Sequence, residues 1–73
     1  MALEEIPIGE SSQIALVAYD LDQMMLLIQF RNNSIYEYQN VPGDIASGFR
    51  GALSPGQFFH QAIKGRFAYK RIA

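Results

Sequence analysis

The chain has 73 residues, which is enough for one hydrophobic core and excludes two domains. Hydrophobic residues make up 49% of it and charged residues only 18%, so an intrinsically disordered chain is excluded. It contains no cysteine, which excludes disulfides and thiolate zinc sites. No apolar run approaches the roughly 18 residues of a membrane-spanning helix, and the N-terminus lacks the basic start of a signal peptide. We therefore expect a cytoplasmic protein.

Charge is segregated along the chain, although the formal net charge is only -1. Residues 1–22 contain acidic but no basic side chains, and residues 50–73 contain basic but no acidic ones. The simpler interpretation is a solvated basic end that the acidic end balances in the fold. The alternative is an anion-binding patch.

The first half of the chain reads as strands. Residues 1–9 contain Pro7 and Gly9 and are expected to form an N-terminal leader that can pair at a sheet edge, ahead of a single domain over 10–73. The apolar run over 13–19 predicts a buried strand, and the segment over 20–23, with its two aspartates, is predicted as the turn after it.

A second strand is predicted over 24–31 because its side chains alternate between two faces. One face carries Leu26, Ile28 and Phe30; the other carries Met25, Leu27, Gln29 and Arg31. Asn32 and Asn33 then predict a two-residue hairpin turn. In the third strand, over 34–38, Tyr36 and Tyr38 share a face. They are interpreted as covering the edge of the core, and the alternative is an exposed platform for bases.

The second half predicts two short helices. Asp44 is a candidate N-cap for the first, in which Ile45 and Phe49 form an apolar face. Ser54, Pro55 and Gln57 form a capping box that starts the second helix. The helix is predicted to bury one apolar stripe and to end at Gly65. The stripe consists of Phe58, Phe59, Ala62 and Ile63. The predicted fold is α+β: an antiparallel three- to four-stranded meander with two short helices and a C-terminal extended segment over 66–73.

Residue types that carry catalysis are scarce. His60 is the only histidine and points outward from its helix, with no second histidine three or four residues away to share a metal. Asp20 and Asp22 are explained by turn chemistry. No phosphate-binding glycine loop is present. The sequence therefore predicts no enzyme, no metal and no cofactor.

Basic and aromatic residues interleave near the C-terminus, in the combination that binders of single-stranded nucleic acid use. The candidate cations are Lys64, Arg66, Lys70 and Arg71, and the candidate stacking rings are Tyr36, Tyr38 and Tyr69. The helix start at Ser54 is a further anion-binding candidate, although capping satisfies the same N–H groups. Against this hypothesis, Phe67 and Tyr69 share one side of a strand and are equally explained as core.

Several short motifs, taken in order, resemble the KTSC domain over roughly residues 10–72. They are Ser11-Ser12, Tyr19-Asp20, Phe30, Tyr36-x-Tyr38, Val41-Pro42, Ser54-x-Gly56, Phe58-Phe59-His60 and Lys64-x-x-x-x-Tyr69-x-Arg71. The family is named for a C-terminal extension of some lysyl-tRNA synthetases and also occurs alone in bacterial and phage proteins. The resemblance implies a small domain without known activity and suggests RNA. The sequence departs from the family at His60, where asparagine is frequent, and at Gly48 and Gly51.

Three functions remain open from the sequence. The first is a non-catalytic module that binds RNA or single-stranded nucleic acid. The second is a self-associating or protein-interaction module that uses apolar residues of the strand face, with Ile8, Met24, Met25 and Leu27 as candidates. The third is a small-nucleotide binder formed between subunits.

Overall fold

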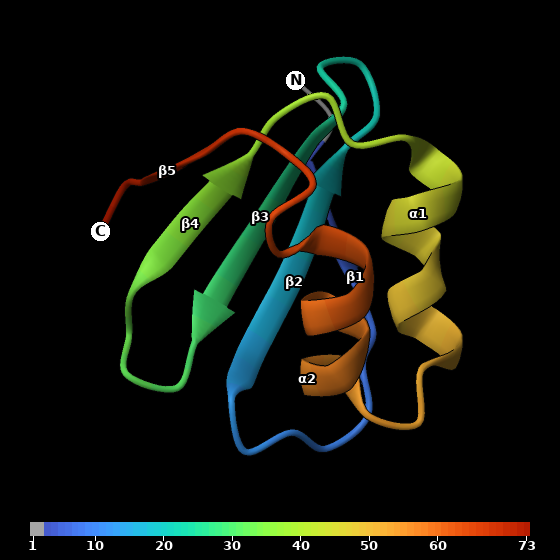
Figure 1. Ribbon diagram of the computed structural model, residues 1–73, viewed down its shortest axis with the longest axis vertical. Coiled ribbons are helices and arrows are strands. Elements are labelled where there is room, and N and C mark those ends of the chain that lie inside the picture. The colour runs from blue at the N-terminus through green and yellow to red at the C-terminus, as the bar shows by residue number, and fades with distance from the viewer. Residues whose placement is uncertain (1–2) are drawn as a thin grey trace.

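The computed structural model describes residues 3–73 and shows a five-stranded antiparallel sheet with its helices packed on one face (Figure 1). The strands lie in chain order: β1 (Leu3–Ile6), β2 (Ile14–Asp20), β3 (Met25–Phe30), β4 (Ile35–Tyr38) and β5 (Tyr69–Arg71). The predicted α+β fold is confirmed. The meander predicted over 13–38 forms the centre of the sheet, while part of the leader and part of the C-terminal segment form its two edges.

The turn between β2 and β3 is organised by Asp20. Its Oδ1 accepts hydrogen bonds from the backbone N–H groups of Asp22 at 3.0 Å and Gln23 at 3.2 Å, and Met24 closes the turn with a φ of 53°. A carboxylate that bonds amides two and three residues ahead fixes a tight turn. The predicted turn is therefore present, with the turn chemistry expected of Asp20.

The hairpin between β3 and β4 has a three-residue loop, so the prediction of a two-residue turn was wrong. The N–H of Asn33 donates to the carbonyl of Phe30, and Asn33 has a φ of 69°. The N–H of Phe30 donates to the carbonyl of Ser34, which closes the loop around residues 31–33. This is a type I turn followed by one left-handed residue. Arg31 consequently lies in the turn and not on a strand face as predicted.

The first helical segment is α1 (Gly43–Ser47), which continues as a 3₁₀ turn, η1 (Gly48–Gly51). Its N-cap is Pro42, which has an extended backbone and whose carbonyl accepts from the N–H of Ala46 at 3.0 Å. Asp44 was predicted as the cap, but it lies one residue inside the helix, where its carboxylate accepts from the N–H of Ile45. The ring of proline favours the extended backbone conformation that an N-cap residue adopts. The helix therefore begins at Gly43, earlier in the chain than a cap at Asp44 would allow.

The second helical segment is α2 (Pro55–Phe58), which continues as a π-helical turn, η2 (Phe59–Ile63). Ser54 caps it as predicted, since its hydroxyl oxygen accepts from the N–H of Gln57 at 3.3 Å. The hydrogen bonds found within residues 3–73 do not include the return bond from the Gln57 side chain, so only one half of the capping box forms. Within η2, the N–H of Lys64 donates to the carbonyl of Phe59 at 2.9 Å.

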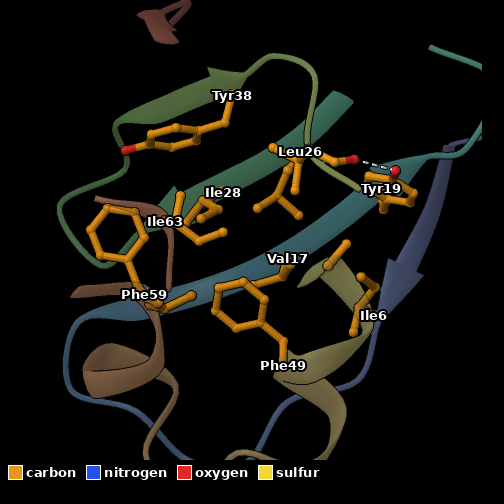
Figure 2. Packing of buried hydrophobic residues seen from close by; sticks show 12 residues of the cluster. Ile6, Val17, Tyr19, Leu26, Ile28, Tyr38, Phe49, Phe59 and Ile63 are labelled. Atoms are coloured by element: carbon orange, nitrogen blue, oxygen red, sulfur yellow. Dashed lines mark hydrogen bonds between the residues drawn. The ribbon is translucent and has the colours of Figure 1, made fainter. Parts of the chain in front are cut away.

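The core lies between the sheet and these helices (Figure 2). Phe49 from η1 and Ile63 from η2 are fully buried against strand residues such as Val17 and Ile28. The hydroxyl of Tyr19 donates a short hydrogen bond to the carbonyl of Val41, which ties β2 to the segment leading into α1. Among residues 3–73, no helix has both the length and the apolar character needed to cross a membrane.

Candidate functional pocket

A pocket of about 600 Å³ opens on the helix-bearing face of the sheet, where the β3–β4 hairpin, β5 and the end of η2 meet. Its lining residues come from segments far apart in the sequence. They are Ser12, Gln13, Phe30, Arg31, Asn32, Ser34, Tyr36, Tyr38, Phe59, His60, Lys64, Gly65 and Tyr69. This volume is in the range of sites that hold small organic ligands.

Five aromatic rings form a connected array along one wall of the pocket. The centroid of Tyr36 lies 5.6 Å from that of Phe30, 6.5 Å from that of Tyr38 and 5.8 Å from that of Tyr69. Phe59 joins the array from η2, with its centroid 5.3 Å from that of Phe30. The strand register explains the arrangement, because Tyr38 pairs with Tyr69 across β4 and β5 and therefore shares a face with it.

The rings differ in how much surface they offer to a ligand. Tyr69 is 60% exposed, Tyr36 is half-buried and Tyr38 is only 5% exposed. Figure 2 shows Tyr38 within the core cluster, on the same side as Phe59. Burial, followed by the neighbouring Tyr69 and Tyr36 hydroxyls, raises the pKa of Tyr38 to about 12. Tyr38 is thus the neutral inner support, and Tyr69 and Tyr36 are the rings available for stacking.

The charged side chains of the lining are both basic. They are Lys64 and Arg31; His60 also lines the pocket, and aspartate and glutamate are absent from its lining within residues 3–73. Arg31 is held in place by a hydrogen bond from its Nε to the carbonyl of Ser11 at 3.1 Å, and the His60 ring packs edge-on against Phe59. A cationic hollow in a chain with net charge -1 favours an anionic ligand.

Half of the residues predicted for binding line this pocket. Lys64, Tyr36, Tyr38 and Tyr69 do so. The remaining four do not. Arg71 pairs with Tyr36 and shares its face, but its Nε donates to the carbonyl of Ala73 and it lies outside the lining.

The other three candidates lie apart from the pocket for identifiable reasons. Lys70 alternates to the opposite face of the sheet, where its ammonium is 3.7 Å from a carboxylate oxygen of Glu37. The Nε of Arg66 donates to the carbonyl of Gln61, and Ser54 is occupied as the cap of α2.

The sequence did not single out Arg31, His60, Phe30 or Phe59 as site residues. The strand pattern did place Phe30 on the face of Leu26 and Ile28, and that alternation is a signal that puts Phe30 beside Tyr36. The strand and helix patterns do not place Arg31 or His60 at the pocket. Arg31 lies in the loop of the three-residue hairpin, and His60 lies in the π-helical turn that continues α2.

In the part of the chain that the structure describes, groups of three or more His, Asp or Glu side chains that could hold a metal ion are absent.

The fold and the pocket define a small α+β domain whose helices cover one face of the sheet and which carries a cationic, aromatic pocket on that face. The family model described as KTSC domain matches residues 10–67. The chain belongs to the KTSC domain family, as its motifs predicted.

Similar proteins include both long enzymes and short chains. A lysine–tRNA ligase from Nostoc sp. is 38% identical over 64 residues, and one from Trichormus variabilis is 36% identical over 64 residues; both matches cover 88% of this chain. This chain spans only 11% of the length of either ligase. An uncharacterised protein from Stutzerimonas stutzeri is 31% identical over 64 residues, covering 86% of this chain and 90% of that protein.

A solved structure of a KTSC domain protein from Yersinia pestis has the same fold. It matches with a TM-score of 0.89 at 39% sequence identity, and the match covers 99% of this chain and 100% of that chain. The five-stranded sheet with its one-sided helices is therefore the fold of the domain over its full length.

Proposed function

We propose that this domain binds single-stranded RNA through the aromatic pocket, without catalysing a reaction on it. The observation that carries the proposal is the position of two rings, the exposed Tyr69 and the half-buried Tyr36, beside the cations Lys64 and Arg31. Among residues 3–73, the lining of this hollow contains no aspartate or glutamate. Rings that stack on bases beside cations that contact phosphates form the general chemistry of single-strand recognition.

The relatives support RNA over other anionic polymers. Two of them are lysine–tRNA ligases, whose name states that they act on a tRNA, and the matching segment is a small part of each. An accessory domain that contacts RNA fits that setting and a cytoplasmic location. Short relatives such as the one from Stutzerimonas stutzeri have no ligase attached, so the domain would bind RNA on its own.

The test is fluorescence anisotropy with a labelled single-stranded RNA of about ten mixed-sequence nucleotides. Tyr69→Ala removes a stacking ring and is expected to weaken binding about 5- to 150-fold, since base–aromatic stacking is worth ~1–3 kcal/mol. Lys64→Ala and Arg31→Ala are expected to weaken binding and to reduce the slope of log affinity against log salt by about 0.7 for each lost phosphate contact.

Arg50 provides a matched control, because it is an exposed arginine on η1, outside the lining of this pocket. Arg50→Ala is expected to leave both affinity and salt slope unchanged. If Arg31→Ala and Arg50→Ala had equal effects, the binding would be general electrostatic attraction and the proposed site would be wrong. Full-strength binding by Tyr69→Ala would also overturn it.

A free mononucleotide is the second candidate ligand, because a pocket of about 600 Å³ is large enough to enclose one. The sequence suggested that such a site would form between subunits, whereas this pocket lies within one copy of the chain. Competition separates the two: displacement of labelled RNA by micromolar adenosine monophosphate favours the mononucleotide, and the absence of displacement favours the strand.

A further inference from the structure

The sheet face opposite the helices is apolar at its centre. Alternation along the strands turns Leu16 and Ala18 of β2, Met25 and Leu27 of β3, and Ile35 of β4 to this face. Both helices lie on the other side of the sheet (Figure 1), and none of the helices or strands of residues 3–73 covers this one. Most of these side chains are only half-buried, although the same face of a stable monomer would ordinarily be polar.

Two of the residues that the sequence suggested for self-association lie on this face, namely Met25 and Leu27. Met24 lies in the turn before β3, and Ile8 packs against the main core on the helix side. The uncovered surface is therefore the strand face itself, defined by the five apolar residues above.

One cross-strand row of this face has charges at its ends and apolar residues at its centre. The register aligns Glu5 with Ala18, Ala18 with Leu27, Leu27 with Glu37 and Glu37 with Lys70. The row therefore runs from an exposed acid on edge strand β1 to an exposed base on edge strand β5. The Lys70 side chain is 62% exposed despite its contact with Glu37.

We propose that a second copy of this chain packs against this face, related by a twofold axis that runs parallel to the strands close to Leu27. Such an axis places β1 of one copy over β5 of the other, so Glu5 of each copy meets Lys70 of its partner and the two Leu27 side chains meet at the centre. A twofold axis perpendicular to the strands would instead stack Lys70 on Lys70 and Glu5 on Glu5. The charge pattern thus selects one orientation of two stacked sheets.

The molecule is large enough for its sheet face to pack on that of a second copy. Its two longer dimensions are 28 and 25 Å, which sets an upper limit on the order of 700 Å² for the flat area of the face, whereas a standard interface buries ~800 Å² of accessible surface per partner. The aromatic pocket lies on the helix side and stays open in such a dimer. Self-association and RNA binding can therefore be measured independently.

The test is sedimentation equilibrium of the full chain at micromolar concentration, combined with a charge swap. We expect a dimer, and we expect Glu5→Lys and Lys70→Glu each to raise its dissociation constant at least about tenfold by placing like charges in contact. The double variant, Glu5→Lys with Lys70→Glu, restores opposite charges across the interface and is expected to recover most of the affinity.

Arg50→Glu is the control, since it reverses a charge that lies outside this face and should leave the dimer unchanged. Circular dichroism of each variant verifies the fold. A strict monomer at these concentrations would overturn the proposal. Failure of the double variant to associate more tightly than either single variant would overturn the assigned orientation.

Discussion

Gly48 lies directly against the ring of Phe58: a Cβ added at Gly48 would come within 2.4 Å of Phe58 Cζ. The ring cannot withdraw freely, because it packs edge-on against the buried Phe49 with a centroid distance of 4.7 Å. The contact joins η1 to the end of α2. The two helical segments can pack this closely because residue 48 has no side chain.

Gly48→Ala is therefore expected to destabilise the domain by about 1–3 kcal/mol, the usual range for overpacking, against a gain of less than ~1 kcal/mol in helix propensity. Gly51 offers a matched control in the same segment, because a Cβ there would meet nothing within 4 Å. Gly51→Ala should be neutral or slightly stabilising. Urea denaturation measures both, and equal effects of the two substitutions would show that the Phe58 contact is unimportant.

A second prediction concerns the hydroxyl of Tyr19, which donates to the carbonyl of the fully buried Val41. Tyr19→Phe leaves that carbonyl without this partner and should lower the free energy of unfolding by about 1–2 kcal/mol. Tyr69→Phe removes a hydroxyl from a ring that is 60% exposed and should change stability little. The same loss in both variants would contradict the structural role of the Tyr19 bond.

The parts of the fold that follow from local rules were predictable from the sequence. The period of two in residues 24–31 assigned β3 and its faces, and the Ser54-Pro55 pair located the start of α2. The loop of the β3–β4 hairpin was misjudged by one residue, because two consecutive asparagines fit either loop length and only the pairing of Phe30 with Ser34 decides between them.

The pocket was only half predictable, for a physical reason. Tyr36, Tyr38 and Tyr69 came from a pattern within strands, and their common face follows from alternation. Strand alternation also separates Lys70 from Tyr69. The sheet register is needed to show that Tyr69, and not Lys70, lies on the face of Tyr38. Arg31 is brought to the pocket by the hairpin loop and is held there by its hydrogen bond to the carbonyl of Ser11, and no spacing in the sequence reveals that contact.

A third prediction distinguishes the two oxygens of Asp20, a fully buried carboxylate. Its Oδ1 bonds two turn amides, whereas Oδ2 has no hydrogen-bond partner in residues 3–73. Asp20→Asn keeps an oxygen that can accept from the turn amides, so its stability should stay within about 1 kcal/mol of the parent. Asp20→Ala leaves the turn amides without that acceptor and should cost about 1–3 kcal/mol. Urea denaturation of the pair decides, and an Asn variant as unstable as the Ala variant would count against the turn role.

The final prediction is a loss of stability at alkaline pH through Tyr38. Burial raises the pKa of Tyr38 from 10.0 to about 12, so the folded chain holds this proton where the unfolded chain has released it. The stability that this provides is complete below pH 10 and declines as the pH rises from about 10 to about 12. A shift of this size corresponds to a loss on the order of 2–3 kcal/mol across that window.

Urea denaturation at a series of pH values from about 8 to about 12 measures this decline, and ultraviolet absorbance follows tyrosinate formation in the folded chain. Tyr38→Phe removes the ionising group and should make the decline shallower over the same window. Part of the decline should persist in that variant, because burial, with Asp44 and Asp20 nearby, also raises the pKa of Tyr19. The variant that combines Tyr38→Phe with Tyr19→Phe should show the shallowest profile. Identical profiles in parent and Tyr38→Phe would mean that the Tyr38 hydroxyl faces water. The assignment of Tyr38 as the buried inner ring of the pocket would then be wrong.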